Sequence, residues 1–129
     1  MERIELSCEL SASPEKVFEA WLSAEGHAEM TGSPATVGVP GTADFTAWDG
    51  YISGRTLEAK PSSRILQTWR TSDFSPEDRD SKLELLFERQ GRGTKLTLRH
   101  SDLPEGSSAE YSQGWMEFYF EPMKTYFSK

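Results

Sequence analysis

The side chains able to do chemistry are few, because the sequence has one cysteine and two histidines. Cys8 and His100 both fall on predicted strands, and a thiol beside an imidazole is a nucleophile and base when both face the interior. A buried structural cysteine is the simpler interpretation. His27 and His100 sit in no metal-binding motif, and a single cysteine excludes a multi-cysteine zinc site. We therefore expect no metal and no cofactor.

Other candidate groups lack the surroundings that catalysis requires. The acidic residues Glu77, Asp78 and Asp80 fall in a predicted loop, where carboxylates are normally solvated. The glycine-rich turn at Gly91 and Gly93 lacks the Lys-Ser/Thr that completes a phosphate-binding loop. The residues thus favour a binding protein over an enzyme.

Aromatic residues offer a different kind of site. They recur at helical spacing near the C-terminus and lie on predicted strands, where they either fill the core or line a ligand cavity. Strand alternation also turns Gln67 and His100 inward, and a buried polar group needs a partner, such as a ligand, a water or a backbone carbonyl. The candidate cavity residues are Phe45, Gln67, Trp69, His100, Trp115, Phe118 and Tyr119.

A cluster of basic residues stands out in an otherwise acidic chain. Arg89, Arg92, Lys95 and Arg99 surround one predicted hairpin. They could dock an acidic partner surface, or they could protect an exposed strand from aggregation as a solvated edge.

Hydrophobic periodicity predicts the elements that position these residues. Alternating apolar residues indicate strands, and Ser13 followed by Pro14 predicts the start of a first short helix, with a second over 23–30. Asp49-Gly50 predicts a hairpin turn, and Gly54 indicates a bulge or a close approach by another element. The expected strands are 4–10, 42–48, the segment from 51, 64–71, 82–89 and 94–100.

The last segment predicts a long helix with an aromatic stripe. Ser107 and Glu110 have the spacing of a capping box. Gly114 favours close packing because glycine weakens a helix, and Pro122 should bend it. An antiparallel sheet needs a cover on one face, and this helix is the longest apolar one. The predicted fold class is α+β, with a curved antiparallel sheet wrapped around a C-terminal helix and two short helices after the first strand.

Length and charge narrow the function further. The 129 residues fit one domain over 1–129, and the net charge of −7 opposes binding to nucleic acid. The N-terminus alternates polar and apolar residues, which is unlike a signal peptide, and no apolar run spans a bilayer. We expect a cytoplasmic protein that does not insert into membranes.

The order of elements resembles the helix-grip fold of the SRPBCC superfamily, which includes START lipid-transfer domains and polyketide cyclases. Local motifs are similar to the C-terminal domain of the activator of heat-shock protein 90 ATPase. The tandem tryptophans and proline that many members carry after the first helices are replaced here by HAEMTGSPA. The similar positions are Pro34-Ala35, Gly41, Phe45, Asp49-Gly50, Ser53-Gly54, Trp69-Arg70, Gly114-Trp115, Tyr119-Phe120 and Lys124.

Three hypotheses follow from the residues and from this resemblance. The first is a non-enzymatic domain that encloses a small apolar ligand between sheet and helix, or docks a protein partner. The resemblance implies the second, a modulator of a heat-shock protein 90-type chaperone. It also implies the third, an enzyme of the cyclase or hydrolase type working in the same cavity. Fold carries over within a superfamily better than function does.

Overall fold

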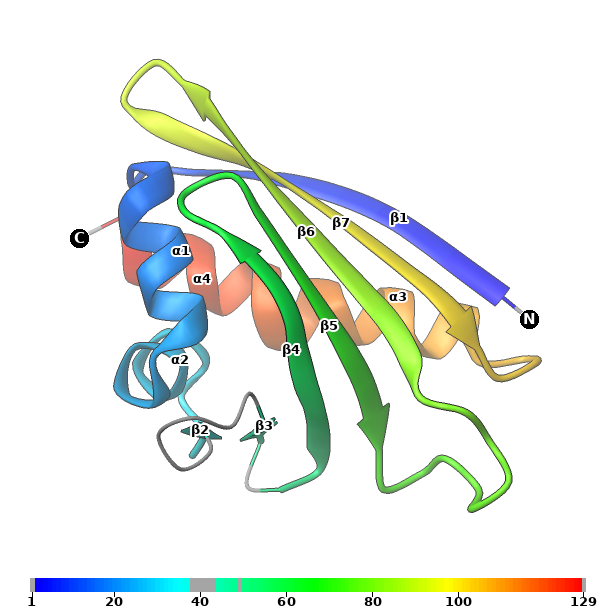
Figure 1. Cartoon of the computed structure of the whole chain (residues 1–129). Coiled ribbons are helices and arrows are strands. Elements are labelled where there is room, and N and C mark those ends of the chain that lie inside the picture. The colour runs from blue at the N-terminus through cyan, green and yellow to red at the C-terminus, as the bar shows by residue number, and fades with distance from the viewer. Residues whose placement is uncertain (1, 38–43, 49, 129) are drawn as a thin grey trace.

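The computed structural model describes residues 2–37, 44–48 and 50–128, and for 36 and 37 only the backbone. Its elements follow the predicted order (Figure 1). The hairpin turn expected at Asp49 and the strand start at 42–43 lie outside the described residues, as does Gly41. The elements are β1 Glu2–Leu10, α1 Pro14–Leu22, α2 Ala24–Thr31, β2 Thr36–Val37, β3 Asp44–Ala47, β4 Ile52–Lys60, β5 Arg64–Thr71, β6 Ser81–Gln90, β7 Gly93–Leu103, α3 Ser108–Trp115, the π-helical turn η1 Met116–Phe120 and α4 Glu121–Phe127.

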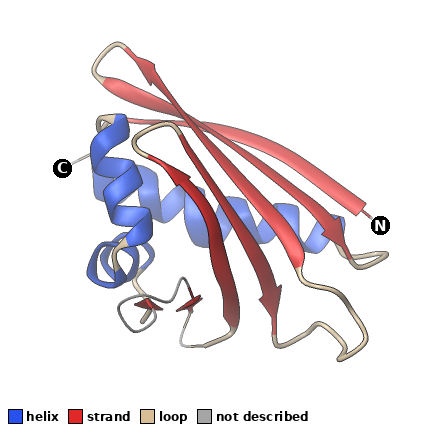
Figure 2. Cartoon of the chain, viewed as in Figure 1, coloured by secondary structure: helices blue, strands red, loops and turns tan. Residues whose placement is uncertain are grey.

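The described strands form one antiparallel sheet of seven strands in the order β1-β7-β6-β5-β4-β3-β2. The sheet curves around the C-terminal helix, which runs across one of its faces as α3, η1 and α4 (Figure 2). The helices α1 and α2 lie at one end of the sheet beside α4 (Figure 1). The predicted α+β helix-grip architecture is confirmed.

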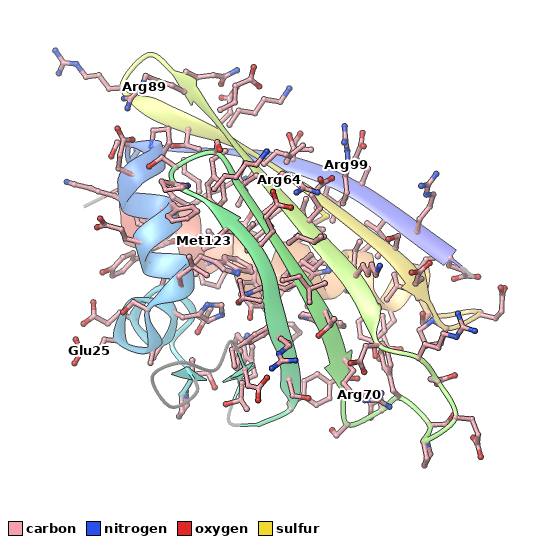
Figure 3. All side chains as sticks on the ribbon, in the orientation of Figure 1. Glu25, Arg64, Arg70, Arg89, Arg99 and Met123 are labelled. Atoms are coloured by element: carbon pink, nitrogen blue, oxygen red, sulfur yellow. The ribbon has the colours of Figure 1, made fainter. Side chains whose placement is uncertain are left out.

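Alternation along the central strands builds the core. Leu83, Leu85 and Phe87 of β6 are buried, while their sequence neighbours are half-buried or exposed. On β7 the inward residues include Leu98 and His100, as the pattern predicts. The opposite sheet face therefore carries polar residues, including the arginines that Figure 3 labels over the strands.

Gly54 marks a close approach between two strands. A Cβ atom built there would lie 2.0 Å from the carbonyl oxygen of Thr68 and 2.9 Å from Cε1 of Phe45. Phe45 is the cross-strand partner of Gly54, so its ring covers the space that a side chain would take. The sheet irregularity lies nearby on the same strand, where the β4–β5 register shifts between Thr56 and Glu58.

The C-terminal helix departs from the regular helix that its spacing predicts. Four residues of an α-helix turn about 400°. Side chains spaced by four residues therefore shift about 40° around the helix axis at each step. The turn η1 is wider, since the Glu121 N–H bonds to the Met116 carbonyl five residues back, and this counters the shift. The buried series is consequently Tyr111, Trp115, Tyr119 and Met123, and Phe118 is turned outward with 52% of its surface exposed. The irregular turn comes immediately before Pro122, which has no N–H to offer the Phe118 carbonyl.

The start of this helix is held by a residue that local sequence did not indicate. The predicted capping box is wrong, because the Ser107 hydroxyl donates to the Pro104 carbonyl and makes no cap. Instead the Glu2 carboxylate accepts from the backbone N–H groups of Gly106, at 2.9 Å, and Ser108, at 2.8 Å. These two hydrogen bonds lower the pKa of Glu2 from 4.5 to about 2. The carboxylate thus ties β1 to the N-terminus of α3.

We predict that Gly54→Ala destabilises the protein by about 2 kcal/mol or more, because the new methyl group clashes with the backbone carbonyl of Thr68. Urea unfolding followed by circular dichroism measures this change. Gly114→Ala is the matched control: its methyl group would meet only Phe118 Cδ2, at 3.9 Å, in ordinary contact. That control should be neutral or stabilising by up to about 1 kcal/mol. Equal stability of the two variants would contradict this account of Gly54.

We also predict that Glu2→Gln destabilises the protein at pH 7 but much less near pH 2. The folded-state pKa of Glu2 lies below its ordinary value, so its contribution is present above pH 4.5 and is lost as the pH falls toward 2. Thermal unfolding of both proteins at several pH values measures the difference in Tm. Glu9→Gln, an exposed change on the same strand, controls for the loss of charge. A difference in Tm that is constant from pH 7 to pH 2 would refute the prediction.

Candidate functional site

A cleft of about 320 Å³ lies between the sheet and the first half of the C-terminal helix. Its walls come from three regions, namely the β3–β4 connection, β5 and the helix. Seven of its ten lining residues are aromatic, and among the other three only Glu110 carries a charge. The lining residues are Trp48, Tyr51, Ile52, Trp69, Glu110, Tyr111, Gly114, Trp115, Phe118 and Tyr119.

Two residues of the C-terminal helix explain why the cleft is open. Gly114 faces the cleft with no side chain, and no atom closer than 3.9 Å would meet a Cβ atom there. The close packing expected at Gly114 is therefore wrong, and the glycine leaves room instead. The π-helical turn places Phe118 at the mouth, with its ring 5.4 Å from that of Trp48. The two rings form the outer wall.

The inner wall is fixed by a chain of buried hydrogen bonds. The Trp115 indole N–H donates to Nδ1 of His100 at 3.0 Å, so the His100 proton lies on Nε2 and is donated to Ser81 Oγ at 2.7 Å. The Ser81 hydroxyl donates in turn to the Trp69 carbonyl. Burial lowers the pKa of His100 to about 3. Both ring nitrogens are engaged, so His100 holds the helix to the sheet and has no lone pair to offer.

A second chain holds Tyr119. The Trp21 carbonyl can only accept, so Nδ1 of His27 carries the proton and donates to it at 3.0 Å. Nε2 then accepts from the Tyr119 hydroxyl at 2.8 Å. Burial lowers the pKa of His27 and raises that of Tyr119. The tyrosine is a neutral wall of the cleft.

Gln67 is satisfied in the same way. Its Oε1 accepts from the Trp21 indole N–H at 3.2 Å, and its Nε2 donates to Thr56 Oγ1 at 3.0 Å. The side chain is 3% exposed and links α1 to two strands. Both polar atoms of the Gln67 side chain are therefore paired with other side chains of the protein, and neither needs a ligand as its hydrogen-bond partner.

One polar atom of the cleft residues is left over. The Trp48 Nε1–H is buried and has no hydrogen-bond partner of normal geometry among the described residues. Its nearest acceptor is the Tyr119 hydroxyl, and this weak hydrogen-bonding contact opposes the rise that burial produces in the pKa of Tyr119. An unpaired buried donor costs about 1–3 kcal/mol, and because this N–H has no surface exposed to the cleft, a ligand acceptor reaches it only when the Trp48 side chain turns.

The structure brings four of the seven candidate cavity residues together. Trp69, Trp115, Phe118 and Tyr119 line the cleft, whereas the other three lie outside the lining: Phe45 covers Gly54, and Gln67 and His100 bond within the core. Sequence reasoning missed the remaining wall, which is Trp48, Tyr51, Ile52, Glu110, Tyr111 and Gly114. Tyr111 could have been found, since it stands one helical turn before Trp115.

The proposed nucleophile and base do not meet. Cys8 pairs with Leu96, and His100 pairs with Ile4 at the other end of β1. Four strand residues, about 13 Å, separate the two positions. Burial also raises the pKa of the Cys8 thiol to about 11, which opposes thiolate formation.

The basic residues around the β6–β7 turn are partly neutralised by the chain itself. Arg89 binds both carboxylate oxygens of Glu15 on α1, and Arg99 bonds to Glu5 at 2.9 Å. Arg92 and Lys95 make no ion pair among the described residues. Figure 3 shows Arg89 near the turn and Arg99 over the strands. Docking of an acidic partner at this hairpin stays a prediction.

The described part of the chain has neither a cluster of metal ligands nor a helix that could span a membrane. There, no group of three His, Cys, Asp or Glu side chains gathers as a metal site would require. None of the described helices has both the length and the apolarity needed to cross a bilayer.

Solved structures share this fold. An HSP90 activator from Plasmodium falciparum superimposes with a TM-score of 0.86 at 23% identity, covering 97% of this chain and 95% of the other. CalU16 from Micromonospora echinospora gives a TM-score of 0.80 at 21% identity, covering 98% of this chain and 76% of the other. At these identities the likeness shows the fold alone.

Sequence comparison goes further. The human protein named activator of 90 kDa heat shock protein ATPase homolog 1 is 28% identical over 115 residues, which are 89% of this chain and 34% of the human protein. This chain thus spans about a third of the length of that relative. The family described as Activator of Hsp90 ATPase homolog 1-like protein matches residues 11–128. The chain therefore belongs to the Activator of Hsp90 ATPase homolog 1-like family.

Proposed function

We propose that this protein binds a small, largely apolar organic molecule in the aromatic cleft and does no chemistry on it. The cleft itself carries the proposal: about 320 Å³ of space, walled mainly by aromatic rings, lies open at the helix-to-sheet junction. Pockets of this size and character are typical of small-molecule sites.

The driving force is removal of apolar surface from water. Enclosing about 200 Å² of apolar ligand surface contributes about 5 kcal/mol before the entropy cost of binding is subtracted. Once the Trp48 side chain turns toward the cleft, its N–H favours a ligand with one hydrogen-bond acceptor, such as a carbonyl, an ether or a hydroxyl oxygen. Orientation would come from that bond and affinity from the rings.

The ionisable groups of the lining favour binding over catalysis. Burial raises the pKa values of Tyr51, Tyr111 and Tyr119, so these phenols stay neutral at pH 7. The cyclase or hydrolase alternative needs a base in the cleft. His100 spends both ring nitrogens on Trp115 and Ser81, and the Glu110 carboxylate of the lining is exposed to water, whereas a general base is normally desolvated.

We predict that Gly114→Leu weakens ligand binding at least about tenfold, because its side chain occupies the cleft. The neutral fluorophore N-phenyl-1-naphthylamine, titrated by its emission, serves as the probe. Removing a helix glycine adds up to about 1 kcal/mol of helix propensity, so the fold should hold, which circular dichroism checks. Gln113→Leu adds the same side chain at the next, exposed position and should leave binding unchanged. Undiminished binding by Gly114→Leu would exclude the cleft as the site.

A second candidate function is modulation of a heat-shock protein 90-type chaperone. The names of the relatives suggest it, and one structural observation favours it: Met116 and Phe118, two positions apart on η1, are 51% and 52% exposed. Phenylalanine and methionine side chains are both enriched at protein interfaces.

This candidate predicts that the protein raises the ATPase rate of a heat-shock protein 90 from the same organism. Met116→Ser should increase the concentration needed for half the effect about tenfold, as removal of an interface anchor does. Met116 does not line the cleft, so the variant leaves ligand binding intact. Leu57→Ser, at a site 49% exposed on the sheet, is the control. An unchanged rate at saturating protein would remove the candidate.

A further inference from the structure

We propose that the ligand of the aromatic cleft is an organic cation, a substituted ammonium whose charge is held by the aromatic rings and by the Glu110 carboxylate. This inference rests on the proposed function and names the chemical class of the ligand. It follows from two properties of the lining, its aromatic composition and the sign of its charge.

Neighbouring rings of the lining pack against each other edge to face. Trp69 and Tyr111 lie 5.3 Å apart between centroids, with 88° between their planes. On the outer wall, Trp48 and Phe118 lie 5.4 Å apart at 70°. A cation within about 6 Å of several ring centroids is attracted by each ring, and tryptophan attracts it most strongly. Three of the four tryptophans in the chain line this cleft.

Charge around the cleft has one sign. Glu110 belongs to the lining and makes no ion pair with the described residues. Asp73 lies outside the lining but accepts a hydrogen bond from the hydroxyl of Tyr51, a lining residue, at 2.6 Å. After burial itself, the charges of Asp73 and Glu110 are among the causes that raise the pKa of Tyr111. Both carboxylates therefore act electrostatically within the cleft.

Among the residues that the structure describes, none that lines the cleft is basic and could balance these carboxylates. Arg70, which contacts the Phe74 ring, is bound to Asp80 at 2.7 Å and to loop carbonyls. An anionic ligand would meet two unbalanced carboxylates and a net charge of −7, whereas a cation is attracted by both. A metal ion would lack the cluster of ligands that it needs among the described residues.

The test uses a matched pair of probes that differ in one atom. Benzyltrimethylammonium carries the cation, and neopentylbenzene replaces its nitrogen by carbon with the same shape. Tryptophan fluorescence of the full chain measures both dissociation constants. We expect the cation to bind at least about threefold more tightly. Glu110→Gln should weaken cation binding about threefold to tenfold and leave the neutral isostere unaffected.

Glu117→Gln is the control, since it removes the same charge from the same helix at an exposed position outside the lining. It should change neither constant by more than about twofold. If both probes bind equally and Glu110→Gln changes neither dissociation constant, the proposal of a cationic ligand is refuted. The cleft then remains a site for neutral molecules. If neither probe nor N-phenyl-1-naphthylamine binds, the proposed function fails as well.

Discussion

The hydrogen bond from the Trp115 indole to His100 sets the position of the C-terminal helix. Both groups are buried, and an unpaired donor or acceptor there would cost about 1–3 kcal/mol. The bond therefore fixes the rotation of the helix about its axis, and the continuation through Ser81 to the Trp69 carbonyl anchors it to two strands. The pairing of His27 with Tyr119 does the same one turn later. With those two side chains committed, the helix cannot settle more deeply on the sheet.

The cleft is the space that remains between the sheet and the helix when these hydrogen bonds hold the helix in place. Between the anchored residues Trp115 and Tyr119, the helix presents Gly114 and Phe118 toward the opening. The π-helical turn keeps the anchors in line while it displaces Phe118 to the mouth. π-helical turns are frequent at functional sites, which agrees with the place of this one beside the cleft. The cleft and the helix geometry thus have a common cause.

The sequence predicted the architecture well, because alternation on β5, β6 and β7 is regular and the sheet needs the helix as its cover. It predicted which residues are buried better than it predicted their hydrogen-bond partners. Gln67 and His100 are inward as expected, but their partners are Trp21, Thr56, Ser81 and Trp115, which only the tertiary structure brings together.

Two features lay beyond local patterns. A capping box at Ser107 is a local signal, yet the carboxylate that caps the helix comes from Glu2, more than a hundred residues away. Likewise, helical spacing alone cannot place Phe118, because one wide turn shifts every later residue around the axis. The full cleft wall therefore could not be predicted, although Tyr111 and Gly114 lay within reach of the helical pattern.

The most direct test of the central claim is a ¹H–¹⁵N spectrum of the indole region during ligand titration. The four tryptophans give one indole N–H signal each. The account predicts that the Trp48 signal moves most, since this ring forms the outer wall and its N–H has no hydrogen bond of normal geometry among the described residues, while those of Trp21 and Trp115 move little because their N–H groups are already bonded. Equal small changes in all four signals, or a large change confined to Trp21, would contradict a ligand site in the aromatic cleft.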